Sequence, residues 1–163
     1  MSTHSPGVIA NSEILARFVF SPIQIDKNGK VKPNSFSHVH SKGCSIQRHS
    51  VAEDAEMQAL VKQVLGKKDN YAWKGVLFGQ CHNIRSIMAD EADHRAVCVY
   101  DTANPGNPAH AELCQTQHID EADENELRHD LFVAFGSGVI IAPLQYRNGE
   151  VWNNLAQDLQ ARK

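Results

Sequence analysis

Residues 36–50, with the sequence FSHVHSKGCSIQRHS, contain three histidines, and two of them have the spacing HxH. In an extended segment His38 and His40 would project from the same face, because side chains alternate along a strand. Two such imidazoles can transfer protons to and from a substrate, or they can bind a metal ion together with ligands from elsewhere in the chain. The alternative without chemistry is a solvated strand end that carries two ordinary histidines.

Positive charge accompanies these histidines. Lys42, Arg48 and His49 lie in the same stretch, and Arg85 follows a predicted strand. A glycine turn flanked by lysine and arginine can present cations and backbone N–H groups to a phosphate, although the residue order of a P-loop is absent. We therefore predict Lys42, Arg48 and Arg85 as substrate-binding residues and His49 as a further acid or base, with an ordinary surface salt bridge as the alternative for Arg85.

A second polar stretch, residues 103–112, has the sequence ANPGNPAHAE. His110 and Glu112 follow its two prolines, and loops on a rigid scaffold often carry function. The HAE triplet resembles the first half of the zinc-deaminase signature, but the PCxxC half is missing downstream. His110 and Glu112 are therefore interpreted as a candidate acid–base pair, or as the polar side of a strand that faces solvent.

The elements that must position these residues are strands and helices in irregular alternation. Apolar and β-branched runs predict strands, an Asn-Gly pair predicts a hairpin turn, and apolar stripes with acidic starts and glycine stops predict helices. A capping box formed by Ser50 and Glu53 would begin the first helix. The predicted strands are 14–20, 71–79, 94–102, 109–119 and 139–143, the turn is at 28–29, and the predicted helices are 50–65, 121–135 and 149–163.

This order of elements favours an α+β fold, with a largely antiparallel or mixed sheet and two to three helices in a single domain spanning residues 1–163. Residues 1–12 are expected to form a mobile N-terminal lead. The chain has 42% hydrophobic residues, a formal charge of -3 and no apolar run long enough to span a bilayer, which argues against duplex DNA and membranes as partners. None of its four cysteines has CxxC spacing. We expect free thiols and a cytoplasmic location.

Three classes of function are compatible with these residues. The first, which we favour, is a small soluble enzyme that acts on a phosphate-containing substrate, such as a nucleotide or RNA, by histidine acid–base chemistry. The second is a non-catalytic domain that binds a protein partner or forms a homo-oligomer. The third is a metal-dependent protein that uses the HxH pair, although the sequence completes no metal site and indicates no cofactor. The enzyme requires residues 38–49 to meet residues 104–112. Its predicted catalytic residues are His38, His40, His49, His110 and Glu112.

Overall fold

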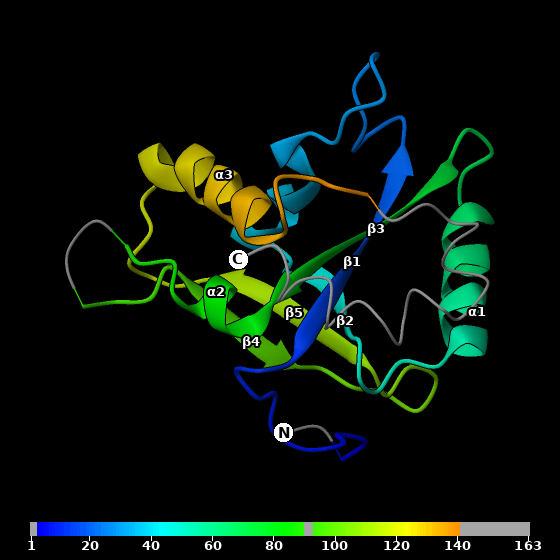
Figure 1. Cartoon of the computed structure of the whole chain (residues 1–163), viewed down its shortest axis with the longest axis horizontal. Helices are drawn as coiled ribbons and strands as arrows, with labels where there is room; N and C mark the ends of the chain where they lie inside the picture. Colours follow the sequence, from blue (N-terminus) through cyan, green and yellow to red (C-terminus); the bar gives the residue numbers. More distant parts are fainter. Residues whose placement is uncertain (1–2, 90–92, 141–163) are drawn as a thin grey trace.

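The computed structural model describes residues 3–89 and 93–140 (Figure 1). Five strands form one antiparallel sheet in the order β3–β1–β2–β5–β4. They are β1 (Ile14–Ser21), β2 (Cys44–Arg48), β3 (Ala72–Gln80), β4 (Val97–Asp101) and β5 (His110–Gln115). The α-helices are α1 (Asp54–Leu65), α2 (Cys81–Arg85) and α3 (Glu124–Ala134), and the 3₁₀ helices are η1 (Pro33–His40) and η2 (Glu121–Asp123). The predicted α+β class is confirmed.

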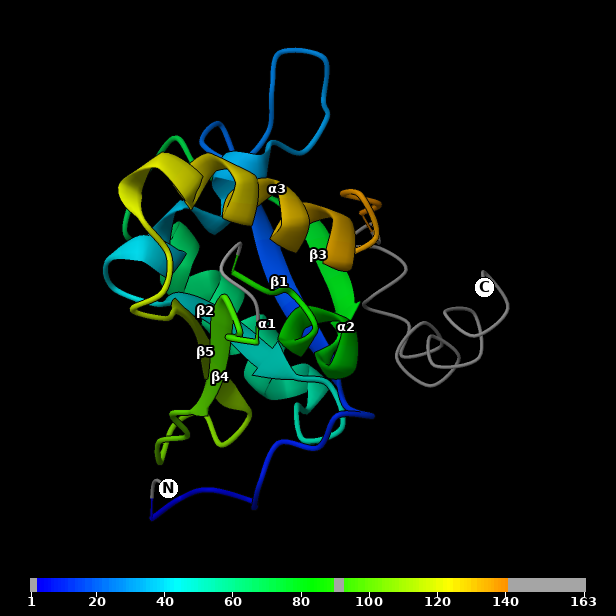
Figure 2. The ribbon, with the colours of Figure 1, turned by 90° about the vertical axis from the view of Figure 1, so that its left-hand side faces the viewer.

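The two faces of the sheet are covered by different elements. On one face η1, α2 and α3 pack over apolar residues that include Leu15 of β1 and Leu77 of β3. On the other face α1 covers β1 and β3 through side chains such as Met57 and Phe78. Figure 2 shows α3 running across the top of the view and α1 behind the strands. No helix within the described ranges has the length and apolar character that crossing a bilayer requires.

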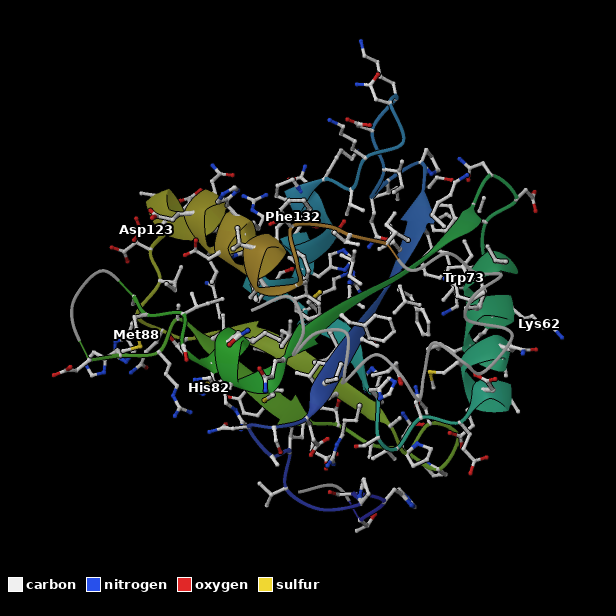
Figure 3. The ribbon with its side chains drawn as sticks, in the orientation of Figure 1. Lys62, Trp73, His82, Met88, Asp123 and Phe132 are labelled. Atoms are coloured by element: carbon white, nitrogen blue, oxygen red, sulfur yellow. The ribbon has the colours of Figure 1, made fainter. Side chains whose placement is uncertain are left out.

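The helix α1 packs on β1 and β3 through one row of apolar side chains. Met57 and Val61, four residues apart, are buried, whereas Lys62 points away from the sheet on the outer side of the helix (Figure 3). At one end of this layer Trp73 packs edge-on against Phe18, with ring centroids 5.9 Å apart. The remaining strands on this face, β2, β5 and β4, present a row of polar side chains, and that row forms the floor of the candidate site.

The predicted strands and turn are largely confirmed, with shifted ends. Strands β1 and β3 match residues 14–20 and 71–79, whereas β4 and β5 are shorter than the predicted 94–102 and 109–119. At the predicted turn, Gly29 has a φ of 80° and the Asp26 N–H donates to the Lys30 carbonyl at 2.8 Å. A single antiparallel bridge between Ile25 and Val31 closes this hairpin.

The predicted start of the first helix and its predicted capping residue are wrong. The first helix begins at Asp54 and not at residue 50, because the Arg48 carbonyl accepts hydrogen bonds from the N–H groups of Val51 and Ala52 and so forms a turn there. Glu53 is the N-cap: its side chain accepts a hydrogen bond from the Glu56 N–H, and its own backbone N–H donates to the Glu56 carboxylate, which completes a capping box. The predicted helix at 121–135 is confirmed as η2 followed by α3.

The HxH segment is helical, so the extended conformation that would give its two histidines a common face does not occur. Pro33 opens η1, and its fixed φ suits a first helical position. A 3₁₀ helix has about three residues per turn, so residues two apart point in different directions. His38 is exposed, whereas the side chain of His40 is 7% exposed. The two imidazoles therefore do not share a face.

The N-terminal residues 7 and 9 contact the folded core, and most of the two elements predicted near the C-terminus lies outside the described residues. Within the predicted N-terminal lead, Ile9 is buried in the core that η1, α2 and α3 cover. The carbonyl of Gly7 accepts a hydrogen bond from Arg48 Nη1 at 2.7 Å. The predicted strand at 139–143 lies mostly outside the described residues, and the predicted helix at 149–163 lies wholly outside them.

Candidate active site

The pairing of β2 with β5 brings the two polar stretches together. In this antiparallel register Gln47 is opposite His110, and Ser45 is opposite Glu112. Alternation along each strand then directs Ser45 and His110 to the same face of the sheet. Their side chains meet there, with Ser45 Oγ 2.7 Å from His110 Nε2. Residues near 38–49 and 104–112 therefore do converge, but through Ser45 and His110.

The second nitrogen of His110 is held by Thr102. Its Nδ1 lies 2.7 Å from Thr102 Oγ1 and 3.4 Å from the Thr102 carbonyl oxygen. A carbonyl can only accept, so a proton on Nδ1 satisfies this side of the ring. Nε2 is then the unprotonated nitrogen, and it accepts the hydroxyl proton of Ser45. The Thr102 carbonyl thereby favours the tautomer that a general base requires.

A cleft opens over Ser45 and His110. It has a volume of about 440 Å³ and lies between α1 and the loop of residues 103–109. Glu56 is the charged side chain among the described residues that line it, and the remaining lining side chains are neutral. Its walls are formed by Glu56, Ala59, Leu60 and Gln63 of α1 and by Asn104, Gly106 and Asn107 of the loop.

Hydrogen bonds within residues 101–107 hold the loop that borders the cleft in one conformation. The backbones of Asn104 and Asn107 exchange two of them, at 3.2 and 3.0 Å. The side-chain oxygen of Asn104 accepts the Gly106 N–H at 3.2 Å, and Asp101 Oδ1 accepts the Ala103 N–H at 3.0 Å. Two prolines further restrict this stretch. The loop therefore presents its amide side chains from a defined backbone.

Arg48, predicted as a substrate contact, is engaged in an internal ion-pair network. Its Nε and Nη2 donate to the two carboxylate oxygens of Glu13 at 2.8 and 2.7 Å, and its Nη1 lies 3.3 Å from Asp101 Oδ2. The side chain is 5% exposed. Arg48 also points to the opposite face of the sheet from His110, because its strand neighbour Gln47 pairs with His110. This network joins the N-terminal segment to β4.

The other predicted binding residues lie elsewhere. Arg85 Nη1 donates to the carbonyl of Ile9 at 3.0 Å and to Asn11 Oδ1 at 2.7 Å. Lys42 is exposed in the turn before β2. His49 packs edge-on against Phe78 at 5.8 Å. None of these side chains, nor Arg48, lines the cleft above His110.

His40 and Glu112 also occupy separate environments. His40 Nδ1 contacts the side-chain oxygen of Gln115 and lies 3.9 Å from a carboxylate oxygen of Glu124 on α3. Glu112 faces the same side of the sheet as His110, but it lies beyond the cleft, next to Cys114. Burial is the main reason that the pKa of the Cys114 thiol is raised, and the negative charge of Glu112 raises it further.

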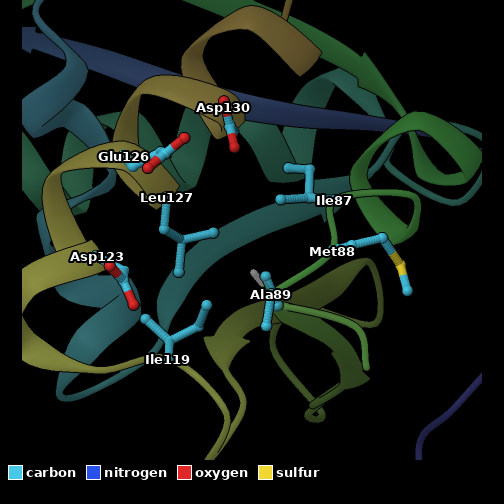
Figure 4. A pocket seen from close by; sticks show the side chains of 9 residues that line it. Ile87, Met88, Ala89, Ile119, Asp123, Glu126, Leu127 and Asp130 are labelled. Atoms are coloured by element: carbon cyan, nitrogen blue, oxygen red, sulfur yellow. The ribbon is translucent and has the colours of Figure 1, made fainter. Parts of the chain in front are cut away.

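Two other cavities lack the pairing of a nucleophile with a base that is found beside His110. One holds about 30 Å³, room for one or two waters, between an apolar floor that includes Leu127 and the carboxylates of Asp123, Glu126 and Asp130 (Figure 4). A wider one, of about 780 Å³ beside Pro22, has no histidine among the described residues that line it. Within residues 3–89 and 93–140, no group of three or more His, Cys, Asp or Glu side chains is arranged to hold a metal ion.

Sequence reasoning identified His110 but missed its main partners. Ser45, Thr102 and Glu56 belong to no motif that the sequence displays. The Pro-rich composition of the loop with Asn104 and Asn107 was the one available signal. Partner strands were not assigned, so the contact between Ser45 and His110 could not be deduced.

Comparisons of the chain with protein-family models, with curated proteins and with solved structures found no match.

Proposed function

We propose that the protein is a hydrolase that cleaves an ester or an amide, with Ser45 as nucleophile and His110 as its general base. The observation that carries this proposal is the 2.7 Å hydrogen bond between Ser45 Oγ and His110 Nε2 at the floor of a cleft. A serine hydroxyl is a weak nucleophile until an adjacent base takes its proton, and imidazole is the base most often used. Ser45 is also exposed, so a substrate can reach it.

The reaction has two halves. Ser45 Oγ attacks the carbonyl carbon while its proton passes to His110 Nε2, and the imidazolium then gives that proton to the leaving group. Water next attacks the acyl group on Ser45, again losing its proton to Nε2, and the serine is regenerated. Thr102 replaces the carboxylate of a serine–histidine–aspartate triad, since it holds Nδ1 with a neutral hydroxyl.

The cleft itself favours a particular kind of substrate. The amide groups of Asn104, Asn107 and Gln63 can donate hydrogen bonds to an oxyanion without carrying charge. Glu56 makes the cleft mildly negative, and no lysine or arginine is found among its described lining residues. We therefore propose a substrate that is neutral or positively charged around the scissile bond. The phosphate-containing substrate predicted from sequence gains no support from these lining residues.

The cytoplasmic location predicted from the sequence remains part of the proposal. Its support is that Cys44, Cys81, Cys98 and Cys114 are all free thiols in the fold, which is the usual state of cysteines in a reducing compartment. Fractionation of cells that produce the full chain tests this directly, because a periplasmic or secreted protein would leave the cytosolic fraction.

A small panel of chromogenic substrates tests the reaction class. The full chain is assayed with p-nitrophenyl acetate, with an aminoacyl p-nitroanilide that carries a free amine, and with p-nitrophenyl phosphate. We expect turnover of the acetate or the anilide and none of the phosphate. In parallel, a fluorophosphonate probe should label Ser45, which peptide mass spectrometry identifies.

Two variants and two controls make the assignment specific. Ser45→Ala should abolish probe labelling, and His110→Gln should lower turnover by about 10²–10⁴-fold, the usual contribution of a general base. Ser41→Ala and His38→Ala change exposed residues outside the cleft and should leave both readouts unchanged. Labelling or turnover that persists in Ser45→Ala would overturn the proposal, and turnover restricted to the phosphate ester would restore the phosphate hypothesis.

A further inference from the structure

Two cysteines face each other across the β4–β5 pair. The antiparallel register places Cys98 directly opposite Cys114. Both are free thiols, and both are partly exposed. They lie on the same face of the sheet as Tyr100, which is 52% exposed. A pair of opposed, accessible thiols on a polar sheet face is a chemical feature that the proposed hydrolase does not use.

The backbone already sets a suitable separation for these cysteines. The Thr116 N–H donates to the Ala96 carbonyl at 2.9 Å and the Thr102 N–H to the His110 carbonyl at 3.3 Å, at the two ends of this ladder. Cys98 and Cys114 lie in phase with those contacts and so form a hydrogen-bonded pair. The Cα atoms of such a pair are about 5.5 Å apart, within the range of about 4.4–6.8 Å that a disulfide spans. A disulfide also requires about 3.5–4.5 Å between the Cβ atoms, which in a hydrogen-bonded pair lie near the upper end of about 4.5–5.5 Å, so the two strands must also move slightly toward each other.

The remaining two cysteines, Cys44 and Cys81, are too buried to react with a disulfide in solution. Cys44 and Cys81 are both fully buried. Cys44 lies on the other face of the sheet, where its thiol contacts the Ser35 carbonyl at 3.8 Å. Cys114, in contrast, is partly exposed. Residue 43, beside it, is glycine, and a Cβ there would lie 3.2 Å from the Cys114 sulfur, so a larger residue at 43 would crowd that sulfur.

We propose that Cys98 and Cys114 form a reversible dithiol–disulfide site that reacts with small-molecule disulfides such as oxidised glutathione. One cysteine, as its thiolate, attacks a sulfur of the oxidant and forms a mixed disulfide, which releases one glutathione thiolate. The second cysteine loses its proton to solvent, attacks the protein sulfur of the mixed disulfide and releases the second glutathione. The protein thereby loses two protons and two electrons, and one oxidised glutathione becomes two reduced molecules.

The site does not depend on the hydrolase proposal, because neither cysteine lines the cleft. The surroundings of Cys114 set how fast it reacts. Burial and the nearby Glu112 raise the pKa of its thiol, which lowers the thiolate fraction at neutral pH. Reaction should therefore be slow at neutral pH and accelerate in alkaline buffer.

The test uses the full chain, incubated with oxidised glutathione, then denatured and alkylated with iodoacetamide. Peptide mass spectrometry should find Cys98 linked to Cys114, with Cys44 and Cys81 alkylated, and dithiothreitol should restore four alkylated cysteines. In Cys98→Ser and Cys114→Ser the remaining partner should retain glutathione as a mixed disulfide. Cys81→Ser is the matched control and should leave the cross-link unchanged.

The wild-type protein alone keeps this proposal falsifiable, whatever the folding of the variants. Stable glutathione adducts on Cys98 or Cys114 without a cross-link would overturn it, because they would show that the second thiol cannot reach the first. A cross-link that includes Cys44 would overturn it as well, since it would mean that the opposed pair is not the reactive one.

Discussion

The guanidinium of Arg48 donates hydrogen bonds to both carboxylate oxygens of Glu13, at 2.8 Å from Nε and 2.7 Å from Nη2. Its Nη1 donates to Asp101 Oδ2 at 3.3 Å. These three side chains are 5%, 13% and 6% exposed. Glu13 precedes β1 and Asp101 ends β4, so the arginine joins the N-terminal segment to the far edge of the sheet. This position makes Arg48 a structural residue, in contrast to a side chain that contacts substrate.

Replacing Arg48 should therefore destabilise the fold. Arg48→Met keeps the apolar stem but leaves two nearly buried carboxylates without a cation, which typically costs about 3–5 kcal/mol of unfolding free energy. Denaturant titration measures the loss. Arg85→Met is the control, because Arg85 contacts only a carbonyl and an amide oxygen in its described surroundings and should cost about 1 kcal/mol. An unchanged unfolding free energy in Arg48→Met would restore Arg48 as a candidate ligand-binding residue.

The case of Arg48 shows what composition could and could not predict. Arginine beside histidines suggests an anion site when only neighbours in sequence are visible. Its carboxylate partners lie 35 and 53 residues away. Strand positions followed from local alternation of apolar residues, but the β2–β5 pairing is a long-range contact, and it alone brings Ser45 to His110. A common face for His38 and His40 requires an extended segment, whereas Pro33 begins a 3₁₀ helix there.

Thr102→Val tests whether Thr102 positions His110. Valine keeps the shape but removes the hydroxyl at 2.7 Å from Nδ1, so the imidazole should spend less time in the productive orientation. We expect kcat for the ester substrate to fall about fivefold to tenfold, the equivalent of one hydrogen bond of about 1 kcal/mol, with KM nearly unchanged. Thr116→Val removes a hydroxyl that contacts the Arg95 carbonyl, outside the cleft, and should leave kcat unaltered. Equal losses in both variants would indicate a general effect on stability.

The charge of Glu112 should control the reactivity of Cys114. Because the pKa of Cys114 is raised, its thiolate fraction at pH 7 is lower than that of a free cysteine and grows as pH rises. Alkylation of Cys114 by iodoacetamide should therefore accelerate steadily from pH 7 to pH 9. Glu112→Gln removes one of the causes of the shift, although not burial, which is the largest, and should speed alkylation at pH 7.5 by about two- to threefold. Glu126→Gln, on α3, is the matched control and should have no effect. A slower reaction in Glu112→Gln would contradict the assigned electrostatics.

Two features favour glycine at residue 43: its positive φ and the lack of space for a Cβ. A pair of variants can distinguish these two effects. Its φ is 80°, and a Cβ there would lie 3.1 Å from Glu112 Oε2 and 3.2 Å from Cys114 Sγ. Gly29 has the same φ, but its Cβ position has no neighbour within 4 Å. Gly29→Ala should therefore cost only the strain of the left-handed conformation, about 1 kcal/mol. Gly43→Ala should cost more, because the added methyl crowds two side chains, and it should also slow formation of the Cys98–Cys114 disulfide by blocking rotation of the Cys114 sulfur. Denaturant titration and the glutathione assay give the two readouts. Equal stability losses in the two variants, with disulfide formation unchanged in Gly43→Ala, would show that the absence of a side chain at residue 43 has no role in the chemistry of Cys114.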